Sequence, residues 1–254
     1  MIDRRERVLA HVVLGVFVLI ALAPVVKIVL GAGSFATAWD DGHFSTYLRS
    51  SAIVTASVVL VSSVLSILAG YAFGLMRFRG EQVLFYVILL GLTIPMEAIV
   101  VPLYYDLRDV GLTDTYWALI LPQAALSTAF GTFWMRAFFR SVPRSLIEAA
   151  RLDGSSSWTT LWRVVLPLGR PAVLTMVVLV FMWTWNEFLL ALVMVSNESL
   201  RTAPLGLAFF QGRNTSDEGL LMAGALIVAA PVVVVYLFLQ RHFIRGMLSG
   251  AVKG

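Results

Sequence analysis

Six long apolar stretches constrain this chain more than any other feature of its sequence: 8–30, 51–76, 83–105, 115–135, 172–195 and 219–240. A helix needs about 20 mostly apolar residues to cross the hydrocarbon core of a bilayer. Lipid offers the backbone no hydrogen-bond partners, so a lipid-exposed segment must satisfy its own N–H and C=O groups, as a helix does. The sequence therefore predicts an all-α integral membrane protein with six transmembrane helices in one domain over 1–254.

The composition supports this class. Hydrophobic residues make up 59% of the chain and charged residues only 13%, whereas a soluble domain carries about 25% charged residues. There is no cysteine, which excludes disulfides and thiolate metal sites. The stretch 8–30 is longer than the apolar core of a secretory signal, so we interpret it as a retained span, with a cleaved signal as the alternative.

The basic residues predict the orientation. With the N-terminus inside, 14 of the 19 basic residues face the cytoplasm: Arg4, Arg5, Arg7, Arg77, Arg79, Arg136, Arg140, Arg144, Arg151, Arg163, Arg170, Arg241, Arg245 and Lys253. The outer side then holds Lys27, Arg49, Arg108, Arg201 and Arg213. Because cytoplasmic loops are enriched in Lys and Arg, both termini are expected in the cytoplasm. This placement explains the pI near 9.7 without a nucleic-acid partner.

The long loop 143–171, between the fourth and fifth predicted spans, has the pattern of a helix–turn–helix. Pro143 suits a helix start, a short helix is expected over 145–153, and Gly154 suits a turn with positive φ. A serine in 155–157 can cap a second helix. Two prolines are expected to end that helix before the fifth span: Pro167 and Pro171. One interpretation is an amphipathic pair packed on lipid headgroups.

The spacing within this loop favours another interpretation, because it resembles the EAA loop of ABC importer permeases. The pattern is Glu-Ala-Ala, three residues, Gly, nine residues, Ile, one residue and Leu-Pro; here Val164 replaces the isoleucine. In that family the loop is a coupling helix that docks on the ATPase subunit. The residues that the resemblance assigns to docking are Glu148, Ala149, Ala150, Asp153, Gly154, Leu166 and Pro167.

Other segments resemble the carbohydrate type of these permeases, specifically the smaller six-span partner of the maltose-type systems. They are Pro95 with 102–104 and 111–115, the segment 185–188, and the tail 240–254. The resemblance implies import of a sugar or sugar-like solute across a prokaryotic cell membrane. It also implies a second, different permease chain, two ABC ATPase subunits and an extracytoplasmic solute-binding protein.

No chemistry is expected on this chain itself. It has no phosphate loop of the Walker type, so ATP and magnesium are expected on the partner ATPase and no cofactor on this chain. The three histidines lie far apart, and no metal site is predicted. The chain is therefore predicted to be a transport subunit and not an enzyme.

Four residues are candidates for the translocation cavity: Glu97, Trp183, Asn186 and Glu187. Both acids fall in the outer half of their predicted spans, and a charge at such depth usually faces protein or water. Aromatic faces and an amide are groups that can hold a sugar. The alternative is that Glu97 and Glu187 are structural and bond to helix ends or to the partner permease.

Two other functions remain open from the sequence. The solute could be a glycerol phosphate ester or an amino acid, carried by the same machinery. A proton-coupled secondary transporter could instead use Glu97 and Glu187 as proton carriers, although it would have no use for the long basic loop. Separately, Gly70 and Gly74 form a small-xxx-small pair that predicts close helix packing by the second span.

Overall fold

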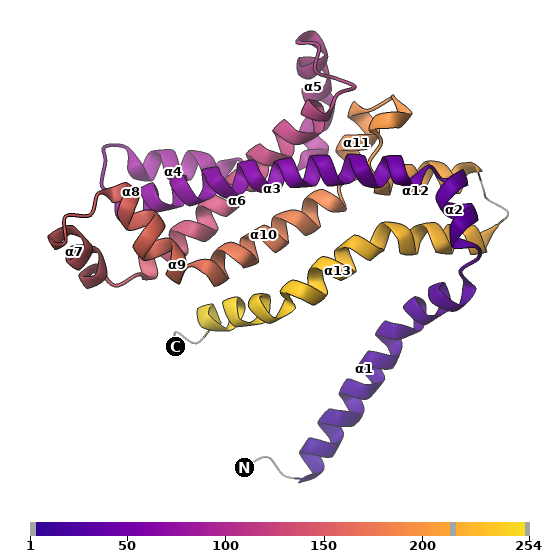
Figure 1. The fold of residues 1–254 in the computed structure, drawn as a ribbon, viewed down its shortest axis with the longest axis horizontal. Helices are drawn as coiled ribbons and strands as arrows, with labels where there is room; N and C mark the ends of the chain where they lie inside the picture. Colours follow the sequence, from indigo (N-terminus) through magenta and orange to yellow (C-terminus); the bar gives the residue numbers. More distant parts are fainter. Residues whose placement is uncertain (1–3, 214–216, 252–254) are drawn as a thin grey trace. The chain divides into compact units, whose positions relative to one another are not determined.

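The computed structural model describes residues 4–213 and 217–251, and within these ranges every regular element is a helix. The chain divides into two compact units, Met1–Ser45 with Gly206–Ala230 and Thr46–Leu205 with Pro231–Gly254. The helices α3 (Phe44–Leu75), α12 (Ala203–Arg213) and α13 (Glu218–Ala251) each begin in one unit and end in the other. Figure 1 shows the elements in sequence order.

The first unit contains α1 (Arg4–Gly31) and α2 (Phe35–Asp41). Its small core forms where the buried Phe44 ring packs edge-on against Phe210, with 5.6 Å between ring centroids. The Gly33 N–H donates to the Gly219 carbonyl at 2.8 Å, which ties the end of α1 to the start of α13. The apolar part of α1, Ala10–Gly31, has no residue buried against the rest of the described chain.

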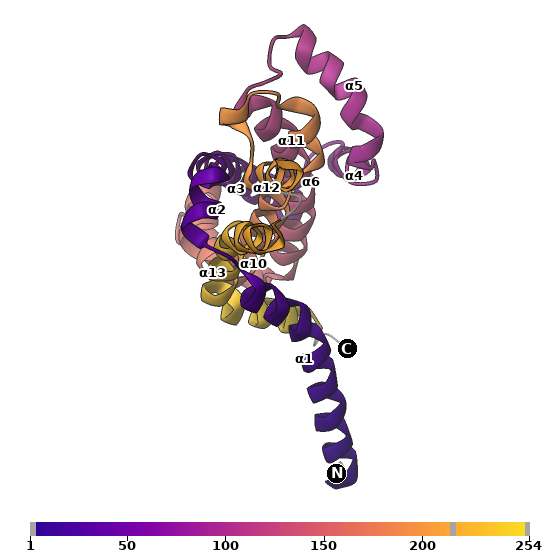
Figure 2. The same ribbon diagram turned by 90° about the vertical axis from the view of Figure 1, so that its right-hand side faces the viewer.

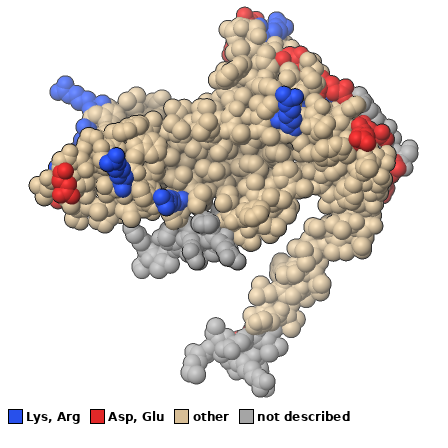
Figure 3. Space-filling model, in the orientation of Figure 1, with Lys and Arg blue, Asp and Glu red and all other residues tan. Residues whose placement is uncertain are grey.

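The second unit is a bundle built around α3, α6 (Tyr116–Ser141) and α10 (Arg170–Trp185). These three helices lie side by side in Figures 1 and 2. The buried core runs along their contact and includes Val58, Leu119 and Met176. Over the face drawn in Figure 3, charged side chains lie near α7 and on the opposite side of the drawing, from α5 onward, and the surface between them is almost uncharged. An uncharged surface of this kind suits a hydrocarbon environment.

Small residues allow α3 and α6 to pack closely. A Cβ placed on Gly70 would lie 2.6 Å from the Met135 Cβ, and one on Gly74 would lie 2.7 Å from the Phe139 Cβ. One turn earlier along both helices, Ser66 contacts α6 where Gly131 leaves room for it. The prediction that Gly70 and Gly74 mark a close helix contact is confirmed, because no side chain larger than hydrogen fits at either position.

Two predicted spans are interrupted. The third, 83–105, is split into α4 (Glu81–Leu90) and α5 (Met96–Asp109), and Figure 2 shows α5 inclined to the bundle. Pro95 immediately precedes α5 and has no backbone N–H to continue a helix. The fifth, 172–195, is split into α10 and α11 (Leu189–Met194). Neither stretch is therefore one continuous helix.

In the part of the chain that the structure describes, four helices are long and apolar enough to cross a membrane: Ala10–Gly31, Phe44–Leu75, Tyr116–Ser141 and Glu218–Gln240. A bent helix pair that includes α10 can provide a fifth crossing. The full set of six spans and the orientation of the termini stay predictions. Of the predicted tail 240–254, the backbone continues in α13 to Ala251, and 252–254 lie outside the described residues.

We expect Gly70→Leu to destabilise the folded protein by about 1–3 kcal/mol or more, because the side chain would force α3 and α6 apart. The control is Gly15→Leu on α1, where an added Cβ has no atom within 4 Å. Thermal unfolding of both purified variants in detergent measures the effect. Equal melting temperatures for the two variants would contradict the close contact.

Candidate functional site

The first helix of the long loop is α7 (Arg144–Leu152), and both its ends follow the predicted pattern. Pro143 precedes it in an extended conformation. Gly154 follows with φ +76°, and the Ser155 N–H donates to the Ala150 carbonyl at 2.9 Å, closing the turn. Glycine adopts this left-handed conformation without the steric cost that a Cβ adds.

The second helix of the loop runs without interruption over Ser157–Leu168, as α8 (Ser157–Thr159), a π-helical stretch η1 (Thr160–Val165) and α9 (Leu166–Leu168). The Ser156 Oγ accepts from the Thr159 N–H at 3.2 Å, which confirms a serine cap in 155–157. The expectation that Pro167 ends this helix is wrong, since Pro167 lies inside it.

The change of direction lies at Gly169. Ser157–Leu168 and α10 meet at an angle of 80°, and Pro171 occupies the first turn of α10, where a proline is tolerated. A Cβ on Gly169 would lie 2.5 Å from the Phe138 ring of α6. The bend is therefore packed directly against a membrane helix.

The two faces of α7 differ sharply. Ile147 and Ala150 are buried, and α7 packs on η1, whose buried side chains include Leu161 and Val165. Glu148 and Ala149 are exposed on the opposite face. Of the predicted docking residues, Asp153, Gly154 and Pro167 are also exposed, and Leu166 is partly buried. Ala150 thus packs within this chain, and Ala149 is the alanine that another subunit can approach.

Sequence reasoning missed Leu152, which is 89% exposed at the end of α7. It lies one helical turn beyond Glu148 and Ala149, so the three side chains share one face. The signal was present in the sequence, because Leu152 falls outside the apolar stripe that Ile147 and Ala150 define. A large apolar side chain exposed at a loop tip points to a contact with another molecule.

The structure gives Glu187 a role at the break between α10 and α11. Its carboxylate accepts from the Leu190 N–H at 2.7 Å and from the Ala191 N–H at 3.2 Å. These groups belong to the first turn of α11, which has no intrahelical partners for them. This geometry fits the structural alternative for Glu187, in which the acid bonds to a helix end.

The other three cavity candidates are exposed side chains: Trp183 lies on α10, Asn186 caps the end of that helix, and Glu97 lies on α5. The Asn186 Nδ2 donates to the Met182 carbonyl at 2.7 Å. Trp183 is 51% exposed and packs edge-on against Phe130, with 4.7 Å between centroids. Glu97 lies in the first turn of α5. A cavity of about 400 Å³ between α3, α10 and α13 has an apolar lining that includes none of the four candidates.

Comparison with known proteins places the chain in a family. Residues 62–249, which include α7, Gly154 and the whole of α10, match the family described as binding-protein-dependent transport system inner membrane component. The chain belongs to this family. The family expected from the loop spacing is thereby confirmed, and the chain is a multi-pass permease component rather than a catalytic subunit.

Two relatives are similar in sequence to most of the permease. It is 39% identical over 221 residues to the probable ABC transporter permease protein YurM of Bacillus subtilis, covering 87% of this chain and 73% of that one. It is 35% identical over 213 residues to the trehalose transport system permease protein SugB of Mycobacterium tuberculosis, covering 83% and 78%.

A solved structure has the same fold. It is a crystal structure of a bacterial ABC transporter involved in the import of the acidic polysaccharide alginate. The likeness has a TM-score of 0.78 and 26% sequence identity, and covers 96% of the permease and 99% of the solved chain.

We expect Glu187→Ala to lower the stability of the permease by about 1–2 kcal/mol, the usual effect of losing a helix cap. Asn186→Ala is the neighbouring control, because it removes a single bond from an exposed side chain. Thermal unfolding of both variants tests the difference. If Glu187→Ala unfolds at the wild-type temperature, the capping role is wrong.

Proposed function

We propose that this permease is one membrane subunit of an ATP-driven, binding-protein-dependent importer that carries a sugar or sugar-like solute into a prokaryotic cell. The family supplies the inner-membrane component of such systems. The choice of solute rests on the relatives, since SugB is described as a trehalose permease and the solved structure as part of an alginate importer.

The proposed topology has six crossings with both termini in the cytoplasm. The 16 residues of α10 span about 24 Å, less than the roughly 30 Å of a hydrocarbon core, so α11 would complete the fifth crossing. In the same way α4 and α5 together would make the third. The distribution of the arginines supports this orientation, because it puts α7 on the cytoplasmic side.

The observation that carries the proposal is the exposed face of α7. Ala149 and Leu152 face away from the chain, next to a turn fixed by Gly154. Glu148 is exposed at the edge of this face, where it also lines the cavity beside α7. The face combines a carboxylate, a small residue that permits close approach and a large apolar side chain. We infer that it docks in a cleft of an ABC ATPase, with Leu152 as its apolar anchor.

The packing offers a route from this face to the membrane. Ile147 and Ala150 fix α7 to η1, and η1 continues through α9 to the bend at Gly169. Beyond the bend lies α10, which packs along α6. A displacement of α7 by a closing ATPase would therefore be transmitted through η1 and α9 to α10.

The remaining partners follow from the same proposal. A second, different permease would complete the pathway, two ATPases would hold ATP and magnesium, and an extracytoplasmic binding protein would deliver the solute. Trp183 and Asn186 are the better candidates for lining the pathway, since both side chains are exposed. Glu97 stays a candidate of the same kind, whereas the Glu187 carboxylate already bonds two backbone N–H groups.

The rival proton-coupled transporter is less well supported. A proton carrier must alternate between its charged and neutral forms during transport, and neutralising Glu187 would weaken the cap on α11. A permease for a glycerol phosphate ester or an amino acid would use the same docking face. The solute experiment below separates it from a sugar permease.

We expect Leu152→Glu and Glu148→Lys to abolish transport and ATPase co-purification, while the permease still inserts into the membrane. Placing an unpaired charge in a desolvated contact weakens binding by about tenfold or more. Arg163→Glu, an exposed charge reversal on η1, is the matched control. Normal co-purification with both α7 variants would exclude α7 as the docking helix.

The solute is tested by reconstituting the complete importer with its binding protein in lipid vesicles. We expect disaccharides or oligosaccharides to stimulate ATP hydrolysis and to accumulate inside. Stimulation by an amino acid or glycerol phosphate, with no sugar active, would overturn the sugar assignment. Uptake that persists without ATP and stops with an uncoupler would overturn the ABC mechanism as well.

A further inference from the structure

A basic cavity lies between α7 and the ends of two membrane helices. Its volume is about 850 Å³, within the usual size of a ligand pocket. The walls come from the end of α3 and the turn after it, the start of α4, the end of α6 and the flank of α7 that carries Arg144, Glu148 and Arg151. Its charged lining residues are Arg77, Glu81, Arg140, Arg144, Glu148 and Arg151.

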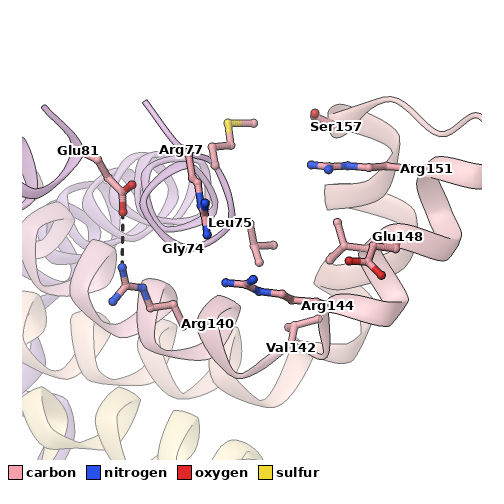
Figure 4. A pocket seen from close by; sticks show the side chains of 12 residues that line it. Gly74, Leu75, Arg77, Glu81, Arg140, Val142, Arg144, Glu148, Arg151 and Ser157 are labelled. Carbon is pink, nitrogen blue, oxygen red and sulfur yellow. Dashed lines mark ion pairs between the residues drawn. The ribbon is translucent and has the colours of Figure 1, made fainter. Parts of the chain in front are cut away.

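Four arginines and two glutamates leave this cavity with an excess of two positive charges. Arg140 pairs with Glu81 at 3.5 Å. Among the described residues, Arg77, Arg144 and Arg151 have no carboxylate within ion-pair distance, and no side-chain hydrogen bond is formed by any of the three. Figure 4 shows Arg144 and Arg151 extending from α7 toward the side where Arg77 lies.

These three arginines, facing one cavity, favour the binding of an anion. Arg144 and Arg151 are two helical turns apart on α7 and line the same cavity as Arg77, which comes from a different element. Glu148 lies between Arg144 and Arg151 along α7, but among the described residues it is within ion-pair distance of neither. The like charges that face the cavity therefore repel each other unless a further counter-charge binds there. The guanidinium group is a planar fork of donors that matches the oxygens of a phosphate.

The location favours a phosphate that belongs to a lipid. The cavity begins where α3 and α6 end, and both helices are long and apolar enough to cross the membrane. Basic pockets between membrane helices on the cytoplasmic side are typical sites for anionic headgroups. A volume of about 850 Å³ exceeds the needs of a bare phosphate and leaves room for a glycerol headgroup.

We propose that this cavity binds a phosphate group, supplied by an anionic phospholipid of the inner leaflet, which bridges Arg77 to Arg144 and Arg151. The site goes beyond sugar import and ATPase docking, neither of which requires it. A bound headgroup links the membrane helices to α7 and so fixes the position from which α7 meets its partner.

The test uses the assembled importer, purified and delipidated in detergent. It is titrated separately with phosphatidylglycerol, phosphatidylcholine and inorganic phosphate, and native mass spectrometry measures the bound fraction. We expect phosphatidylglycerol to bind in preference to phosphatidylcholine. R144Q/R151Q should weaken that binding about tenfold or more, because it removes the charge-assisted hydrogen bonds of two guanidinium groups.

The control is R163Q, which removes an exposed arginine of the same loop that does not line the cavity. R77Q tests the same site from the opposite wall, in case the double variant does not assemble. Arginine-dependent binding of inorganic phosphate alone would keep the phosphate site and identify its ligand as a free ion. Equal binding of both lipids, or binding unchanged in R77Q and R144Q/R151Q, would overturn the proposal.

Discussion

The absence of backbone hydrogen-bond partners in lipid is the constraint on which this structure depends. It explains the long helices, and it also explains the polar residues where helices are interrupted. Glu187 caps α11 after the break in 172–195. At the far end of α11, the Asp114 Oδ1 accepts from the N–H groups of Ser196 and Asn197, at 3.0 and 2.8 Å. Polar side chains therefore stand where the backbone lacks partners, and their presence in a span is not by itself a sign of transport.

Small residues determine how the membrane helices meet. Gly70 and Gly74 allow α3 to approach the backbone of α6, a contact that lipid cannot replace because it depends on fit between surfaces. Gly169 permits a similar close contact at the end of the loop, because the Phe138 ring lies where a Cβ on this residue would be. The rigid α3–α6 pair is thus the frame against which the bend before α10, and with it α7, is held.

The sequence predicted the loop helix, its turn at Gly154 and the membrane class, because these depend on local rules: proline and glycine conformations, helix caps and apolar length. Predictions from the sequence were less accurate where packing between helices determines which side chains are buried. Ala150 was expected on the docking face and is buried against η1, while Leu152 was overlooked and is exposed. Pro167 was expected to end a helix that in fact continues to Leu168, and the chain changes direction at Gly169 instead.

The sequence alone determined the family, through the spacing from Glu148 to Pro167, and the six apolar stretches that a bilayer requires. Only the tertiary structure decided which side chains of α7 are free to meet another subunit. The tertiary structure alone also brought Arg77, Arg144 and Arg151 to one cavity. It alone showed that the Glu187 carboxylate caps the start of α11. The physical reason is the same in each case: spacing along a chain fixes the face of a helix, and packing between helices fixes what that face meets.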